Sequence, residues 1–147
     1  MSVKVFVDTN VLVYARDASE PEKQAQAAWW MATLWEKRAG RLSYQVLQEF
    51  YVTVTGKLSP GLDKELARRD IRALGAWQPL AADSRVLEGA WLLQDRNRLH
   101  WWDALIAAAA QLSECQYLLS EDFQEGLHLG NLKVIHPFMQ RPEDLSW

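Results

Sequence analysis

The sequence predicts an α/β fold of three layers, in which helices cover both faces of a short central parallel sheet. Short apolar runs at Val3–Val7, Gln116–Leu119 and Leu132–His136 indicate strands. Segments with apolar residues at helical spacing separate them, and such alternation is typical of a parallel sheet covered on both faces. The 147 residues suit a single domain, residues 1–147, because domains most often hold roughly 100–150 residues.

Capping and turn residues set the expected boundaries of the helices. Pro21 suits the first turn of a helix, and Gly40 suits the position after its end. The expected helices are a short one from Val11, then Pro21–Ala39, Gln45–Gly56, Asp63–Trp77, Ser84–Asn97 and Trp102–Cys115, with brief strands at Arg41–Tyr44 and Leu80.

The composition is that of an ordinary globular protein, with 49% apolar and 24% charged residues. Cys115 is the only cysteine, so no internal disulfide can form, and its apolar surroundings predict a buried side chain. The sequence shows no signal-peptide pattern, and its longest apolar stretch, Ala104–Ala110, is too short to span a membrane, so we expect a cytoplasmic protein. A net charge of −3 by itself disfavours a nucleic-acid partner, because such proteins are usually basic.

Acidic side chains are expected at one edge of the sheet. Asp8 ends the first strand, and Asp122 follows the strand at 116–119. Asp103 begins an alanine-rich helix, and a helix that follows a strand starts at the carboxyl edge, where ligands bind in such sheets. Glu49 is a fourth candidate, because it is a charge on a largely apolar helical segment.

Each of these acids also has a simpler explanation. Asp8 and Asp103 can be helix N-caps. Glu49 alone is better explained as an exposed helix residue, and Asp122 can be a turn residue. Convergence favours the functional interpretation, because clustered carboxylates repel one another unless they are splayed into solvent or a cation holds them.

The residue types indicate which cation such a cluster would hold. Cys115 is alone, and His100, His128 and His136 show no metal-ligand spacing, so a zinc site is not expected. A shell of carboxylates selects Mg²⁺ or Mn²⁺. Mg²⁺ prefers few protein ligands together with substrate phosphates, which indicates phosphate chemistry and offsets the objection from net charge.

Four segments together resemble the PIN-domain nucleases, in particular VapC-like toxins of type II toxin–antitoxin systems. They are FVDTNVLVYA (6–15), VLQEFY (46–51), WWDALIAAAA (101–110) and LLSEDFQEG (118–126). Each motif is weak alone, but the four occur in order and each carries an acid. The resemblance implies a compact PIN-like α/β/α fold, a Mg²⁺ site that Mn²⁺ can also fill, and cleavage of single-stranded RNA. It implies Asp8, Glu49, Asp103 and Asp122 as the acidic cluster, supported by Thr9, Asn10 and Ser120.

The expected reaction is hydrolysis of a phosphodiester by a metal-activated water. Asp8 is the expected central ligand, with Asp103 and Asp122 binding directly or through water. Glu49 would hold a water and, if buried, could act as general base. Glu121 could also reach the metal, but the Ser-x-Asp spacing favours Asp122.

Two groups of cationic and aromatic residues are candidates for RNA contact. Arg68, Arg69 and Arg72 share one helix, and we favour a solvated charged face there, because Glu65 and Asp70 can pair with them. Arg96 and Arg98 precede Trp101-Trp102, which would either stack on RNA or belong to the core.

Two other functions fit a similar pattern. An aspartate-based phosphatase needs a second Asp two residues after the first, and Asn10 stands there instead. A non-catalytic metal- and RNA-binding module on the same fold remains as the alternative.

The helix at Pro21–Ala39 carries two apolar stripes. We expect Ala25, Ala28, Trp29, Ala32 and Trp35 to face the core. The second strip, Trp30 to Leu34 with Met31, can be buried by the chain itself or form an interface. The resemblance to VapC-like toxins favours the interface, with a cognate antitoxin on this strip, and implies a homodimer.

Overall fold

The computed structural model describes residues 2–147 and confirms the predicted α/β class. Its strands are β1 (Val5–Val7), β2 (Gly40–Arg41), β3 (Tyr117–Leu119), β4 (His128–Leu129) and β5 (Leu132–Ile135). Its α-helices are α1 (Thr9–Tyr14), α2 (Pro21–Lys37), α3 (Tyr44–Gly56), α4 (Lys64–Leu74), α5 (Ser84–Arg96) and α6 (Trp101–Leu112), with 3-10 turns at Gly75–Trp77 and Pro142–Asp144.

The sheet has the strand order β2-β1-β3-β5-β4, and its first four strands run parallel. β1 therefore lies between β2 and β3, and its three residues are fully buried. A strand buried on both faces is what a parallel sheet covered by helices requires. The expected three layers are confirmed, with β4 added as an antiparallel edge strand that the sequence did not reveal.

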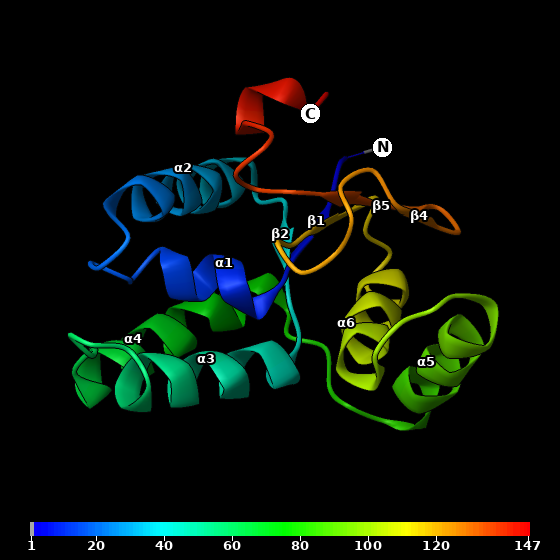
Figure 1. Ribbon diagram of the computed structural model, residues 1–147, viewed down its shortest axis with the longest axis horizontal. Coiled ribbons are helices and arrows are strands. Elements are labelled where there is room, and N and C mark those ends of the chain that lie inside the picture. Colours follow the sequence, from blue (N-terminus) through cyan, green and yellow to red (C-terminus); the bar gives the residue numbers. More distant parts are fainter. Residues whose placement is uncertain (1) are drawn as a thin grey trace.

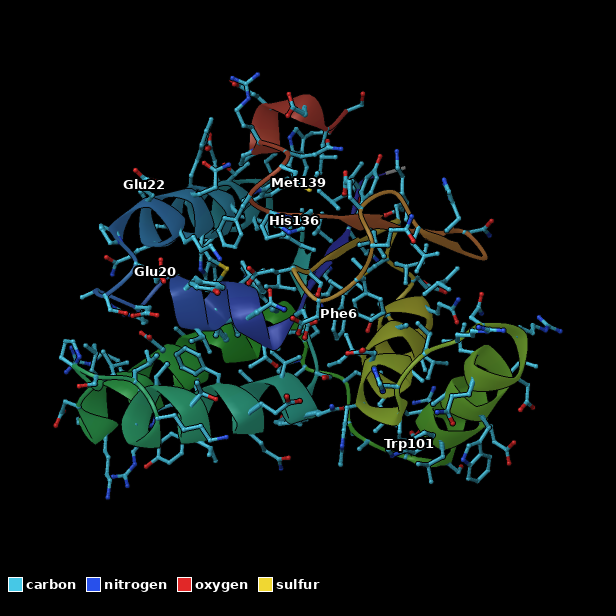
Figure 2. The ribbon with its side chains drawn as sticks, viewed as in Figure 1. Phe6, Glu20, Glu22, Trp101, His136 and Met139 are labelled. Atoms are coloured by element: carbon cyan, nitrogen blue, oxygen red, sulfur yellow. The ribbon has the colours of Figure 1, made fainter. Side chains whose placement is uncertain are left out.

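The helices form two groups around this sheet. α1 contacts both α2 and α3, and α3 contacts α4. α5 and α6 pack side by side away from that group (Figure 1). Phe6 of β1 lies in the interior, whereas Glu20 and Met139 lie at the periphery (Figure 2). Among residues 2–147, no helix is both long and apolar enough to cross a membrane.

Side chains at the helix starts explain several boundaries. Ser43 Oγ accepts a hydrogen bond from the Val46 amide and caps α3. Asp63 and Asp83 cap α4 and α5 in the same way. Each such cap satisfies an amide that the helix itself cannot pair. Cys115 is buried, as predicted.

The predicted orientation of α2 is wrong. Trp30 and Leu34 are fully buried, and the Trp30 indole N–H donates to the Pro137 carbonyl at 2.9 Å. The stripe expected in the core instead faces outward, with Trp29 41% and Trp35 40% exposed. The Trp30–Leu34 strip therefore belongs to the core and cannot be an interface.

Replacement of Trp30 should therefore destabilise the fold far more than replacement of its neighbour. We expect Trp30→Ala to lower the free energy of unfolding by about 3–5 kcal/mol, the usual cost of truncating a large buried aromatic residue. Trp29→Ala on the same helix should cost well under half as much. Urea denaturation of both variants measures the difference, and equal losses would contradict this orientation of α2.

Candidate active site

Asp8 is the most buried acid of the predicted cluster, with 5% of its surface exposed. It follows β1 directly and is the N-cap of α1, so its carboxylate lies at the carboxyl edge of the sheet. That carboxylate accepts hydrogen bonds from the Thr9 amide and the Ser120 hydroxyl, both at 2.7 Å. Burial raises the pKa of Asp8 to about 7, although these two hydrogen bonds lower it. The cap explanation of Asp8 is therefore confirmed, and its role in a functional site stays a prediction.

Asn10 connects Asp8 to the loop that follows β3. Its side-chain NH₂ lies 3.4 Å from Asp8 Oδ2, 3.3 Å from Ser120 Oγ and 3.2 Å from Asp122 Oδ2. Its side-chain oxygen accepts from the Glu121 amide at 3.2 Å, and Ser120 Oγ accepts from the Asp122 amide at 3.1 Å. These contacts bring Asp8 and Asp122 to the same side-chain NH₂ group of Asn10.

Asp103 reaches the same edge by a route the sequence did not predict. It lies in the first turn of α6, but α6 follows α5 and not a strand. His100 is the residue at the N-cap, so the cap explanation of Asp103 is wrong. Burial and the charge of Asp122 raise the pKa of Asp103, and the two carboxylates line one hollow. Asp103 therefore lies close enough to Asp122 for their charges to interact.

Glu49 lies at the margin of the cluster. It is exposed on α3, and its carboxylate accepts a hydrogen bond from Gln45 at 2.9 Å. Its negative charge still contributes to the raised pKa of Asp8, as does that of Asp122.

Glu121 pairs with a lysine and not with the other residues of the acidic cluster. Its carboxylate forms an ion pair of 2.8 Å with Lys23 of α2. The Lys23 ammonium also lies 4.7 Å from the centre of the Tyr14 ring. Sequence analysis did not single out Lys23, because no pattern links it to Glu121, 98 positions away. This ion pair occupies the Glu121 carboxylate, so Asp122 stays the predicted acid of the pair.

Some of the candidate RNA-binding side chains contact other residues of the protein, and others are exposed to solvent. Arg72 pairs with Glu65 at 3.3 Å, and Arg68 lies over the Tyr51 ring. Trp102 is not in the core, since 66% of its surface is exposed. Trp101 is half-buried and stacks on Trp91 of α5; it lies at the α6 end nearest α5 (Figure 2).

The oxygen groups at this edge suit a hard divalent ion. Within residues 2–147, no three His, Cys, Asp or Glu side chains lie close enough to hold one ion together. Mg²⁺ does not need three, because it commonly binds one or two carboxylates and keeps several waters. Thr9 Oγ1, next to Asp8, is buried without a hydrogen-bond partner in the described part of the chain. A buried hydroxyl without a partner calls for a further polar group, such as water or a ligand.

Comparison with known structures identifies this architecture. The chain is similar to a toxin–antitoxin complex from Klebsiella pneumoniae, with 20% identity, a TM-score of 0.63, and coverage of 91% of this chain and 98% of that one. It is also similar to VapBC2 from Rickettsia felis bound to a promoter DNA fragment, with 17% identity, a TM-score of 0.59, and coverage of 90% and 97%. FitAcB from Neisseria gonorrhoeae gives 17% identity, a TM-score of 0.60, and coverage of 92% and 99%.

At these identities the similarity establishes the fold. No curated protein matches the sequence. The PIN domain, by contrast, matches residues 5–124. Because that match covers most of the 147 residues, the chain belongs to the PIN-domain family.

Proposed function

We propose that this protein is an endoribonuclease that cleaves single-stranded RNA with Mg²⁺ or Mn²⁺, and that it is the toxin of a toxin–antitoxin pair. The observation that carries the proposal is the buried Asp8 carboxylate beside Asp122, at the carboxyl edge of a parallel sheet. A buried acid with a raised pKa near other acids is a feature of functional sites. Membership of the PIN-domain family supports nuclease chemistry.

In this proposal each residue of the cluster has a distinct role. Asp8 and Asp122 would hold the ion, and Asp103 would bind it directly or through water. A bound divalent ion would supply charge neutralisation at the phosphate and a more acidic water. Ser120 and Asn10 would keep the two carboxylates oriented through the hydrogen bonds described above.

Glu49 and Thr9 would act at the margins of the reaction. Glu49 is exposed, so the burial that a general-base role requires is not met, and we assign it the binding of a water. The Thr9 hydroxyl has no partner within residues 2–147, so it is free to contact a phosphate oxygen or a water. No histidine is needed in this scheme.

An antitoxin would bind on the outward face of α2, in place of the strip that proved to be core. A hollow of about 240 Å³ lies there between α1, α2, α3 and α4. Its apolar lining includes Leu12, Ala28, Met31, Trp35 and Phe50. The Arg16–Asp70 ion pair also lies in its wall. An amphipathic segment could bury apolar side chains in such a groove and meet this charged pair. The similar structures are toxin–antitoxin complexes, which supports a partner of this kind. The homodimer and the cytoplasmic location stay predictions.

The purified protein should cleave single-stranded RNA with Mg²⁺ or Mn²⁺, and EDTA should stop the reaction. Asp8→Asn and Asp103→Asn should each lower the rate by at least about a hundredfold, which is common when one stabilising group is lost. Glu114→Gln is the matched control, because Glu114 lines a hollow on another part of the surface. Labelled RNA on a denaturing gel provides the measurement. Full activity of both site variants, or activity in EDTA, would refute the proposal, and binding of RNA without turnover would favour the non-catalytic module.

In EDTA, the protein should become less stable as the pH rises from about 4 to about 7. The pKa of Asp8 is raised from 3.8 to about 7, so within this window the folded state holds a proton that the unfolded chain has released. The corresponding loss in the free energy of unfolding is on the order of 4 kcal/mol, since one pKa unit is about 1.4 kcal/mol. Urea denaturation at a series of pH values measures the slope.

Asp8→Asn should flatten this pH dependence, and an unchanged slope would contradict the assignment to Asp8. At pH 7.5, Mn²⁺ should raise the Tm of the wild type through binding to the folded state. It should raise the Tm of Asp103→Asn less, and an equal rise would show that Asp103 is not a ligand.

The antitoxin should be the product of a small reading frame adjacent to this one, and co-expression should relieve growth inhibition and yield a complex. Ala28→Glu should weaken that complex at least about tenfold, because it places a charge in an apolar groove. Ala82→Glu is the control, since Ala82 is also exposed but lies before α5. Affinity is measured by titration of the purified partners, and equal affinities of the two variants would place the antitoxin elsewhere.

A further inference from the structure

The loop after β3 carries two adjacent acids, Glu121 and Asp122, whose side chains have different partners. The Asp122 carboxylate lies 3.2 Å from the side-chain NH₂ of Asn10, at the acidic cluster. The Glu121 carboxylate lies 2.8 Å from the Lys23 ammonium of α2. The Glu121 amide nevertheless donates to the Asn10 side-chain oxygen at 3.2 Å, so its backbone stays at the edge of the cluster. The contact with Lys23 therefore concerns the side chain of Glu121, which it directs toward α2.

Lys23 is held in place by more than this ion pair. Its ammonium also donates to the Tyr14 hydroxyl at 3.3 Å and lies 4.7 Å from the centre of the Tyr14 ring. The centre of the Phe138 ring lies 5.2 Å from the same ammonium, and the Phe138 and Tyr14 rings pack edge-on against each other. Contacts between a cation and aromatic rings stabilise the cation where it lies. The partner of Glu121 is therefore positioned before any ligand binds.

Other cationic groups near the cluster do not form such a pair. Arg98 and His100 are exposed and line the hollow beside the acidic cluster. In the described part of the chain, neither forms an ion pair with an acid, and the acids of the predicted cluster form none either. Pairing with Lys23 therefore neutralises Glu121, while the charges of the cluster stay available to a metal ion.

Loss of Lys23 would leave the Glu121 carboxylate without a partner. Only 25% of the Glu121 side chain is exposed, and a mostly buried carboxylate that loses its cation is unfavourable. A divalent ion held by the adjacent Asp122 would offer a replacement, because hard cations bind carboxylate oxygens. Each further carboxylate on such an ion takes a position that a water or a substrate phosphate would otherwise occupy.

We propose that Lys23 is a positioning residue of the site, which keeps Glu121 off the cation. By doing so it keeps positions on the cation open for water and for the phosphate of the substrate. The inference rests on the proposed function, because it assumes that Asp8 and Asp122 hold a divalent ion. Lys23 acts through Glu121 and contacts neither the ion nor the RNA.

The first experiment measures Mn²⁺ binding by calorimetric titration of the purified protein without RNA. Lys23→Met keeps an unbranched side chain over the two rings but removes its charge. It should tighten Mn²⁺ binding at least about fivefold, because the released Glu121 carboxylate adds a negative charge at contact distance from the ion. Lys37→Met is the matched control, since Lys37 is an exposed lysine at the other end of α2, and it should leave the affinity unchanged.

A double variant determines whether Glu121 causes the effect. Lys23→Met combined with Glu121→Gln has the same net charge as the wild type, and it should return the Mn²⁺ affinity to within about twofold of the wild-type value. Unchanged or weaker Mn²⁺ binding by Lys23→Met would overturn the proposal. An increase in affinity that Glu121→Gln does not reverse, or an equal increase in Lys37→Met, would also overturn it.

The second experiment measures the initial rate of cleavage of a labelled single-stranded RNA at saturating Mn²⁺. Lys23→Met should be about ten- to hundredfold slower, the usual loss when a residue that orients a metal ligand is changed, and the double variant should recover. A loss that Glu121→Gln does not restore would overturn the proposal, because Lys23 would then act on the RNA directly.

The two proposals can fail separately. If the wild type cleaves RNA but all variants bind Mn²⁺ equally, the role of Lys23 is overturned and the nuclease function stands. If the wild type cleaves no RNA but Mn²⁺ binding changes as expected in Lys23→Met and in the double variant, the nuclease function is overturned and the role of Lys23 at the metal site stands.

Discussion

The hydrogen bond from the Ser120 hydroxyl to the buried Asp8 carboxylate joins the ends of two neighbouring parallel strands. Asp8 could not be buried there at low cost without it, because a carboxylate removed from water needs compensating donors. The same hydroxyl accepts from the Asp122 amide and the Asn10 side chain. One buried contact therefore sets the geometry of the loop after β3 and, through it, the position of the second acid.

The residues that lie at the carboxyl edge of the sheet could be predicted where they directly follow a strand. Asp8 and Asp122 follow strands that pair in parallel, so their meeting follows from topology alone. Asp103 was expected for the wrong reason, because α6 comes after α5 and is placed by packing against that helix. Lys23 could not have been found, since its pairing with Glu121 joins segments that no local pattern connects. The sequence pattern was enough to place residues that directly follow a strand. The positions of residues on packed helices could be found only from the structure.

The orientation of α2 was predicted wrongly for the same reason, because it is set by packing against distant parts of the chain. Both of its stripes contain tryptophan, and helical spacing shows that a stripe exists but not which stripe faces the core. The choice is made by tertiary contacts, among them the hydrogen bond that the Trp30 indole donates to the Pro137 carbonyl, 107 positions away. With Trp30 buried, the alternative stripe is left outward around a hollow. The candidate interface of α2 therefore lies on its outward side, at the hollow lined by Ala28 and Trp35.

A cation held by the carboxylates would answer the objection raised by the net charge of −3. A protein that held RNA mainly through its phosphates would need a basic surface. The hollow beside Asp103 and Asp122 is lined by Arg98 and His100 together with apolar and carboxamide side chains. Such a cation would offset the charge of one phosphate, and Arg98 could contact another. A local site of this kind would let a protein that is acidic overall act on RNA, because the charge that a phosphate meets is set by its immediate neighbours and not by the net charge.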